Sequence, residues 1–243
     1  MGPIEFPLPP QSLRFMAEND EKFIKIAKEI TSLLVDHGLR KDDNLLDLGC
    51  GYGRLAYGLR EGANFDGHYL GMDILERHIV WCSEHLQSVD NRYEFKHLDI
   101  LNARYNPLGS VSAESWQIGI EQQFDFVSLF SVFTHMYEEE IRNYLQQIHT
   151  ALVKGGRCFS TFFLYDEQRL EKITNPDNVL CMGFELNDHT RFHNADDKLH
   201  AICFEKSYIE SMILDAGFTI LKTNYGQWAG GDQSYQDFVL MEK

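Results

Sequence analysis

The sequence predicts an α/β fold whose central sheet is doubly wound and mostly parallel. Short apolar segments alternate with stretches of helical periodicity, which is typical of right-handed βαβ crossovers. The first apolar segment ends in a glycine-rich turn, as strands of such sheets often do at a ligand site. A length of 243 residues with 44% hydrophobic residues is sufficient for one large core. We therefore expect a single domain over residues 1–243.

The predicted strands follow an N-terminal helical lead-in. The lead-in covers residues 1–40, where apolar residues recur at helical spacing from Phe23 to Leu34 and stop before Gly38. The predicted strands are Asn44–Leu48, Tyr69–Met72, Tyr93–Leu98, Phe124–Phe130, Arg157–Leu164, Phe218–Thr223 and Tyr235–Met241. The last two are close enough to pair antiparallel, because a parallel crossover needs roughly a dozen residues or more.

Predicted helices separate most of these strands. They lie at Arg54–Arg60, at Glu76–Leu86, around the apolar positions Ile141, Leu145, Ile148 and Leu152, and from Ser207 to Gly217. Gly155 and Gly156 are expected to end the third of these helices before the fifth strand begins. A capping box formed by Ser207 and Glu210 is expected to open the last helix.

Two segments interrupt the alternation of strands and helices. Residues 102–123 lie between the third and fourth strands, and residues 165–204 follow the fifth. Loops of this length in a compact domain are usually functional or disordered. Both follow the carboxyl ends of parallel strands, where open α/β sheets bind ligands, so we expect substrate-side insertions. Tolerated surface insertions are the alternative, which is weaker for the second segment because it carries His189, Arg191, Phe192 and His193 together.

Charge and cysteine content narrow the classes of partner. The chain has 22 Lys+Arg and 37 Asp+Glu, a formal net charge of -15, and such a field repels nucleic acids and anionic membranes. The five cysteines form no C-x-x-C pair, so neither disulfides nor a zinc site is expected, and we recognise no carboxylate-rich metal cluster. No leader or membrane-spanning run is recognised either. The sequence therefore predicts a cytoplasmic protein without a bound metal.

Glycines and acidic residues gather at the predicted ends of the first three strands. Asp47-Leu48-Gly49-Cys50-Gly51-Tyr52-Gly53 ends the first strand and opens a helix, so its backbone can approach a ligand and the helix amides can bind a polar group. Asp73 ends the second strand, where it can accept both hydroxyls of a ribose, and Asp99 ends the third, within reach of an adenine amino group. Asp47 can hold the loop and face an ammonium group. A nicotinamide dinucleotide explains the glycines and Asp73 but gives Asp47 no role.

This constellation resembles that of the class I, Rossmann-like, S-adenosylmethionine-dependent methyltransferases. Asp47-x-Gly49-x-Gly51-x-Gly53 is similar to their first motif, and Leu152-x-x-Gly155-Gly156 to their turn before the fifth strand. The resemblance implies a seven-stranded sheet with an antiparallel last strand, S-adenosyl-L-methionine as donor and S-adenosyl-L-homocysteine as product. The cofactor-binding residues that it implies are Asp47, Gly49, Cys50, Gly51, Gly53, Asp73, Ile74, Asp99, Ile100, Phe130 and Ser131. Ile74 and Ile100 are expected to line the adenosine as apolar neighbours. The alternative is that both side chains belong to the hydrophobic core.

His135 is the candidate general base, because it follows the tip of the fourth strand and an imidazole can accept a proton at neutral pH. A contact with the donor or with backbone is the alternative. The candidates for the acceptor pocket are Tyr137, Tyr165, Asp166, His193 and Trp228, each of which can also be structural. A base is needed only where the acceptor has a proton to lose, because alignment alone can supply much of the rate.

The sequence thus predicts methyl transfer to a small-molecule acceptor, with O-methylation favoured over N-methylation. Ser234–Asp237 loosely resembles small-molecule and sugar-modifying methyltransferases, which favours a metabolite or a sugar as acceptor. Two alternatives are a nicotinamide-dinucleotide-dependent oxidoreductase and a protein that binds S-adenosylmethionine without catalysis. The identity of the acceptor and the oligomeric state do not follow from these residues.

Overall fold

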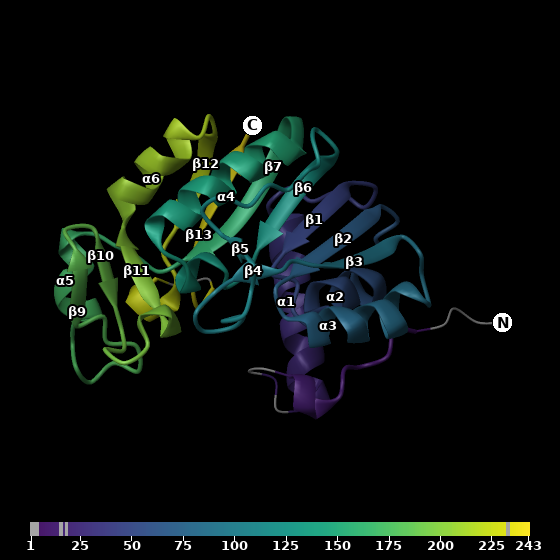
Figure 1. Cartoon of the computed structure of the whole chain (residues 1–243), viewed down its shortest axis with the longest axis horizontal. Coiled ribbons are helices and arrows are strands. Elements are labelled where there is room, and N and C mark those ends of the chain that lie inside the picture. Colours follow the sequence, from purple (N-terminus) through teal and green to yellow (C-terminus); the bar gives the residue numbers. More distant parts are fainter. Residues whose placement is uncertain (1–4, 15–16, 18, 232–233) are drawn as a thin grey trace. The chain divides into compact units, whose positions relative to one another are not determined.

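The computed structural model of the chain describes residues 5–14, 17, 19–231 and 234–243 (Figure 1). Residues 1–4, 15, 16 and 18 of the predicted lead-in lie outside these ranges. The chain forms two compact units. Unit 1 comprises Met1–Asp99 and Phe124–Ser128, and unit 2 comprises Ile100–Gln123 and Leu129–Lys243. The expectation of a single domain with two insertions stays a prediction.

A seven-stranded sheet carries the fold. Its strands are β1 (Asn44–Leu48), β2 (His68–Asp73), β3 (Tyr93–His97), β6 (Phe124–Leu129), β7 (Leu152–Phe162), β12 (Thr219–Asn224) and β13 (Asp237–Glu242), in the order β12-β13-β7-β6-β1-β2-β3. β1 pairs in parallel with β2 and β6, and β2 pairs in parallel with β3. The last strand, β13, is antiparallel to both β7 and β12. The sheet confirms the predicted α/β, Rossmann-like fold class.

Unit 1 has its three long helices on the same side of β1, β2 and β3 (Figure 1). These are α1 (Asp20–Asp36), α2 (Arg54–Gly62) and α3 (Glu76–Cys82). Asn19 caps the start of α1, and its side chain accepts a hydrogen bond from the Lys22 N–H at 2.8 Å. β1 is buried at Leu45, Leu46 and Leu48, which is typical of an interior parallel strand. The helix predicted over residues 76–86 ends as a π-helical turn, η2 (Ser83–Gln87).

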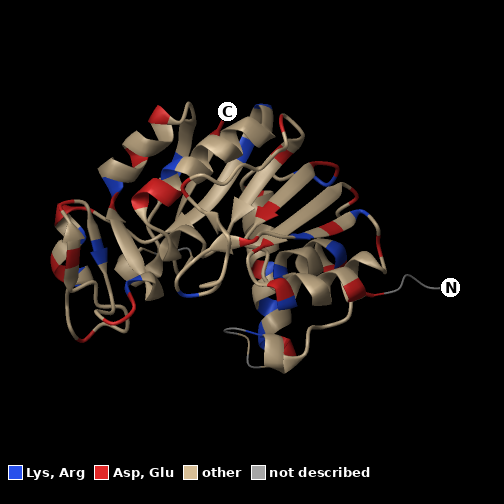
Figure 2. Ribbon diagram, in the orientation of Figure 1, with Lys and Arg blue, Asp and Glu red and all other residues tan. Residues whose placement is uncertain are grey.

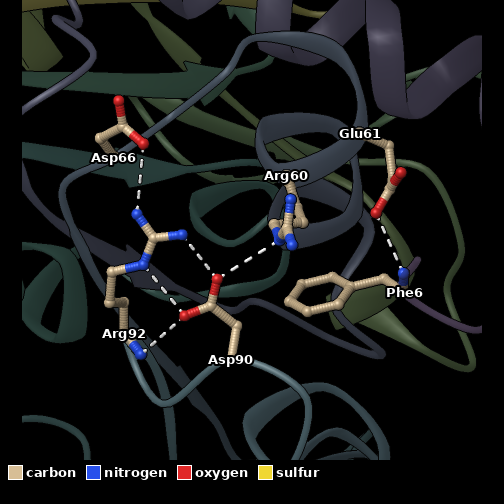
Figure 3. Close-up of polar contacts among 6 residues, drawn as sticks. All are labelled: Phe6, Arg60, Glu61, Asp66, Asp90 and Arg92. Atoms are coloured by element: carbon tan, nitrogen blue, oxygen red, sulfur yellow. Dashed lines mark hydrogen bonds and ion pairs between the residues drawn. The ribbon is translucent and has the colours of Figure 1, made fainter. Parts of the chain in front are cut away.

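A network of ion pairs lies at the edge of unit 1 where β2 and β3 begin (Figure 3). Asp90 accepts a hydrogen bond from Arg92 Nη2 at 2.6 Å and lies 3.3 Å from Arg60 Nε. Arg92 Nη1 also lies 3.3 Å from Asp66 Oδ1. The hydrogen bonds from Arg92 lower the pKa of Asp90. Parallel strands end at the opposite edge from the one at which they begin, so this network lies away from Asp73 at the end of β2.

Unit 2 contains α4 (Glu138–Ala151), α5 (Glu167–Ile173), α6 (Lys206–Asp215) and a second, four-stranded sheet in the order β8-β11-β10-β9. The strands of this sheet are β8 (Leu164–Tyr165), β9 (Phe184–Asn187), β10 (Thr190–Phe192) and β11 (Ile202–Glu205). The segment 165–204 was expected as a substrate-side insertion, which stays a prediction, and its strands were not predicted. Strands of three or four residues are too short to show a periodicity in the sequence.

The predicted start of the fifth strand is also wrong. β7 begins at Leu152 rather than at Arg157. The Gly155 N–H donates to the Lys243 carbonyl at 2.9 Å, and the Lys243 N–H donates to the Gly156 carbonyl at 3.0 Å. The two glycines therefore pair with the last residue of the chain, a partner that local sequence patterns do not reveal.

The predicted capping box of the last helix is not formed. α6 begins at Lys206, and the Ser207 hydroxyl donates to Glu205 Oε1 at 2.6 Å instead of capping the helix. Glu210 accepts a hydrogen bond from the Thr223 hydroxyl at 2.9 Å. The side chains of both predicted partners therefore serve other contacts.

The surface carries charges of both signs. Lys and Arg residues are scattered among Asp and Glu residues in both units (Figure 2). All five cysteines are free thiols. In the described part of the chain, no helix combines the length and the apolar content that crossing a bilayer requires.

Candidate functional site

The glycine-rich loop after β1 is held by the end of β2. The N–H groups of Gly49 and Cys50 donate to the Met72 carbonyl at 2.7 and 3.1 Å, and the Gly51 N–H donates to Asp73 Oδ2 at 2.7 Å. Gly49, Gly51 and Gly53 have φ values of 81°, 55° and 78°. Only glycine adopts this left-handed region without a steric penalty. The loop conformation therefore depends on all three glycines.

Two of these glycines differ in their surroundings. A Cβ at Gly51 would meet no atom within 4 Å, so the space beside this backbone is open. A Cβ at Gly53 would lie 2.5 Å from Leu86 Cδ1 and 3.2 Å from Cys82 Sγ. The absence of a side chain at Gly53 thus permits α2 to pack closely on α3 and η2. The predicted contact of Gly53 with a cofactor stays a prediction. Gly51 is the position at which a ligand can approach the backbone.

Asp47 is buried within the sheet, with 3% of its surface exposed. Its Oδ1 accepts a hydrogen bond from the Ser128 hydroxyl on β6 at 2.9 Å, and its Oδ2 accepts one from the Tyr69 hydroxyl on β2 at 2.7 Å. Burial raises the pKa of Asp47 to about 6, against the effect of the two hydrogen bonds. Asp47 therefore joins β1 to both neighbouring strands, and its predicted contact with an ammonium group stays a prediction.

Asp73 joins the glycine loop to the turn after β2. Its Oδ2 accepts from the Gly51 N–H and its Oδ1 from the Leu75 N–H, both at 2.7 Å. Burial raises the pKa of Asp73, while these two hydrogen bonds oppose the rise. Each carboxylate oxygen has more than one lone pair, so both can accept a further donor. The predicted bonds to ribose hydroxyls are compatible with this geometry.

The other cofactor candidates occupy different surroundings. Asp99 is exposed just after β3, and Ile74 is half-buried after β2. Cys50 is buried, which raises the pKa of its thiol well above the usual range. Ile100, in the short strand β4 (Ile100–Leu101) of unit 2, is only 2% exposed, as the core-packing alternative requires.

The end of β6 has a strained backbone at a predicted cofactor position. Ser131 has a φ of 57°, which is uncommon for a residue with a side chain. Its N–H donates to the Thr161 hydroxyl at 2.8 Å, and its own hydroxyl donates to Gln236 Oε1 at 3.0 Å. Phe130 packs on Phe159 with ring centroids 5.5 Å apart. Strain of this kind often occurs at functional sites, which is consistent with the expected role of Ser131.

His135 connects the two predicted insertions of unit 2. Its Nδ1 lies 2.8 Å from the Leu199 carbonyl, which can only accept, so Nδ1 carries the proton. Its Nε2 lies 3.5 Å from the Tyr105 hydroxyl, and its backbone carbonyl accepts from Asn102 Nδ2 at 3.2 Å. Burial lowers the pKa of His135. The candidate base is thus a neutral imidazole with a lone pair on Nε2.

Tyr105 was not a candidate in the sequence. Its position inside the predicted insertion 102–123 was the only signal. Its ring lies 5.3 Å from the His135 ring in an edge-on arrangement. The contact joins residues 30 positions apart, so only the folded chain reveals it.

Three of the five acceptor candidates have structural partners near α5. Tyr165 and Trp228 are buried in one apolar cluster. Asp166 caps α5 through the Arg169 N–H at 3.0 Å and accepts a hydrogen bond from the Tyr225 hydroxyl at 2.7 Å. These contacts support the structural alternative for Tyr165, Asp166 and Trp228.

Asp237, which was not a candidate, organises the same region. It is completely buried and accepts hydrogen bonds from the Gly226 N–H at 2.6 Å, from Trp228 Nε1 at 2.7 Å and from the Leu164 N–H. Burial raises its pKa to about 7 against these bonds. The backbone donors make Asp237 a centre of loop packing.

The remaining two acceptor candidates lie elsewhere in unit 2. Tyr137 precedes α4, is 36% exposed, and its N–H donates to Glu140 Oε2 at 2.6 Å. His193 is half-buried after β10, with its Nδ1 3.1 Å from the Cys181 carbonyl. Their roles toward an acceptor stay predictions.

Comparisons with known proteins agree with this architecture. The fold is similar to that of the PH0226 protein of Pyrococcus horikoshii OT3, with 16% identity, a TM-score of 0.62 and coverage of 92% of each chain. It is also similar to 1,6-didemethyltoxoflavin-N1-methyltransferase of Burkholderia thailandensis, with 17% identity, a TM-score of 0.56 and coverage of 92% of this chain and 79% of that chain. It is similar as well to magnesium protoporphyrin IX methyltransferase of Synechocystis PCC 6803, with 15% identity, a TM-score of 0.54 and coverage of 95% of this chain and 85% of that chain.

These identities are low, so the structural likeness concerns the fold alone. A family model described as a methyltransferase domain matches residues 39–217, which is well over half of the chain. The chain therefore belongs to the methyltransferase domain family.

Proposed function

We propose that this protein transfers a methyl group from S-adenosylmethionine to a small-molecule acceptor. The observation that carries the proposal is the glycine loop of unit 1, which closes on Asp73 and leaves open space beside Gly51. Membership of the methyltransferase domain family supports it. Two similar structures also support it, since the Burkholderia enzyme was solved with S-adenosylhomocysteine and the Synechocystis enzyme with S-adenosylmethionine.

The residues of unit 1 fit the chemistry of this donor, which supplies an electrophilic methyl group when bound. Asp73 offers lone pairs to ribose hydroxyls beside the open backbone of Gly51. Asp99 is exposed just after β3, where it can accept from an adenine amino group. Asp47 is negatively charged above its pKa of about 6, which favours an ammonium group nearby. Ile74 and Cys50 complete the predicted contacts on this unit.

His135 is suited to accept a proton from the acceptor. The Leu199 carbonyl holds the imidazole in the tautomer that exposes the Nε2 lone pair. Burial lowers the pKa of His135, so the ring is neutral at pH 7. A neutral base favours an acceptor hydroxyl, whose proton must leave during O-methylation. An amine acceptor is the alternative, and it also loses a proton during the reaction.

A titration followed by an acceptor screen tests the proposal. Calorimetric titration with S-adenosylmethionine, S-adenosylhomocysteine and the nicotinamide dinucleotides measures which ligand binds. We expect binding of the first two and no tight binding of a dinucleotide, and the reverse would overturn the proposed donor. A mass-spectrometric screen for a gain of one methyl group then separates an enzyme from a silent binding protein. Fragmentation of the product distinguishes O- from N-methylation.

A cytoplasmic location and the lack of nucleic-acid binding are part of the same proposal. A formal net charge of -15 supports both a small-molecule acceptor and weak binding to nucleic acid. Absence of binding to labelled duplex DNA and RNA at low salt is the expected result.

A further inference from the structure

Three histidines of unit 2 lie close to the short segment 199–201. The Leu199 carbonyl accepts from His135 Nδ1 at 2.8 Å, and the Ala201 carbonyl accepts from the His193 N–H at 3.0 Å. His200 lies between these two residues, and its ring centroid is 5.3 Å from that of His193. We call His135, His193 and His200 the imidazole cluster. Residues far apart in the sequence are thus gathered around His200.

A guanidinium group stands beside this cluster. Arg104 pairs with Asp197 and lies over the Tyr105 ring, with Cζ 5.3 Å from the ring centroid. Tyr105 in turn contacts His135. The pKa values of His135 and His200 are lowered mainly by burial and further by the positive charge of Arg104. The ion pair with Asp197 leaves Arg104 further donors for hydrogen bonds, since a guanidinium presents five N–H groups.

The imidazoles of the cluster offer ring nitrogens to a ligand. His135 and His193 use Nδ1 toward carbonyl oxygens, so each neutral ring leaves Nε2 as an acceptor. A protonated imidazole is a donor at both ring nitrogens. The burial that lowers the pKa of His135 and of His200 would be offset by an opposite charge placed beside these rings. The cluster therefore suits a ligand that brings negative charge.

A metal ion fits the arrangement less well. Within the described ranges of the chain, no group of three or more His, Cys, Asp or Glu side chains is placed to hold a metal ion.

We propose that Arg104 and the imidazole cluster bind an oxyanion, the carboxylate or phosphate group of the methyl acceptor. This inference rests on the proposed function, and it narrows the acceptor from any small molecule to an acid. The bound anion stabilises the protonated ring of His200. It also returns the pKa of His135 toward its ordinary range, where an imidazole is a more effective base at neutral pH.

Sulfate is a suitable probe, because its charge does not change between pH 6 and pH 8. We expect sulfate to bind the wild-type protein more tightly as the pH falls, since binding takes up protons. The charged and titratable groups around the cluster are Arg104, Asp197, Lys198 and Tyr105. Histidine ring signals in NMR spectra report the pKa of each imidazole, and those of His135 and His200 should rise when sulfate binds.

Arg104→Gln should weaken sulfate binding about tenfold, the effect of losing one hydrogen bond to a charged group. Arg157→Gln is the matched control, because Arg157 also belongs to a surface ion pair, with Glu242 at 3.1 Å. Equal weakening in both variants would overturn the proposal. If Arg104→Gln does not fold, His200→Gln provides a second test. Sulfate binding by this variant should depend less on pH than binding by the wild type, and an unchanged pH dependence would contradict the proposal.

An acceptor screen with matched compounds distinguishes the two sources of the anion. Each candidate is offered as a carboxylic acid, as a phosphate monoester and as a neutral amide. Faster turnover of the carboxylic acids or of the phosphate monoesters than of the amides supports the proposal and identifies the anionic group. Amides that are turned over at the same rate contradict it. Donor titration in the same samples separates the two claims. Normal S-adenosylmethionine binding without sulfate binding refutes only the oxyanion site, and absent donor binding refutes the proposed function.

Discussion

The glycine loop of unit 1 and the surroundings of His135 in unit 2 are built from contacts of different range. The loop is closed by Asp73, only 22 residues from Gly51, at the end of the neighbouring parallel strand. His135 instead contacts Tyr105, 30 residues before it, and Leu199, 64 residues after it. The proposed donor-binding loop is built on adjacent strands and needs little of the chain, whereas the surroundings of the candidate base draw on two segments far apart in the sequence.

Substitution of His135 tests the long-range region and should have the largest effect. His135→Asn should lower turnover about a hundredfold to ten-thousandfold, because asparagine cannot take up a proton at neutral pH, while donor affinity stays near that of the wild type. The wild-type rate should fall as the pH drops through the pKa of His135, which burial lowers, and the variant should lack this fall. Tyr105→Phe keeps the ring beside His135 and removes only the hydroxyl 3.5 Å from Nε2, so it should lower turnover less and keep the pH dependence. A variant with normal turnover and the same pH profile would leave alignment as the mechanism.

Substitutions of Gly51 and Gly53 test the glycine loop, the region built from short-range contacts. Gly51→Val should weaken donor binding by up to about a hundredfold, because the new side chain occupies the open space beside the backbone and strains its left-handed conformation. Both variants strain a left-handed backbone, and Gly53→Val should lower the free energy of unfolding further, because its side chain also meets Leu86. Titration calorimetry and urea denaturation measure the two effects. Normal donor binding by a folded Gly51→Val protein would show that the loop assignment is wrong.

Asp73→Asn should weaken donor binding about tenfold, through loss of a charge-assisted bond, while one amide oxygen still accepts from the loop. Asp90→Asn is the matched control, because Asp90 lies in the ion-pair network at the opposite edge of the same sheet (Figure 3). It should lower the free energy of unfolding slightly and leave donor affinity unchanged. Equal loss of affinity in both variants would indicate a general effect on unit 1.

The pH dependence of stability should show that Asp47 is a buried structural acid. Its folded pKa of about 6 lies above the unfolded value, so the folded state binds more protons between those two values. Its contribution is fully present below the unfolded pKa of about 3.9 and is lost as the pH rises through about 6, on the order of 3 kcal/mol. In Asp47→Asn, urea unfolding should lack this loss. A constant difference between the two proteins from pH 4 to pH 7 would contradict the assignment.

The seven-stranded sheet and the cofactor motif could be predicted from the sequence, because both depend on patterns of residues that lie close together along the chain. β1 holds three buried leucines just before the glycine-rich turn, and the acids Asp73 and Asp99 lie at the ends of successive strands, positions that a parallel sheet brings to one edge. The strands of the second sheet were missed, because none is longer than four residues. The start of β7 was missed because its glycines pair with Lys243, the last residue of the chain.

The sequence by itself determined the strands of the seven-stranded sheet, the glycine loop and the acids at the strand ends, because these depend on periodicity and on residue types close together along the chain. Only the tertiary structure decided that Asp47 is enclosed by Ser128 and Tyr69, and that Leu199 sets the tautomer of His135. Such contacts join residues from 22 to 81 positions apart. Their partners follow from the path of the folded chain, which no local pattern records.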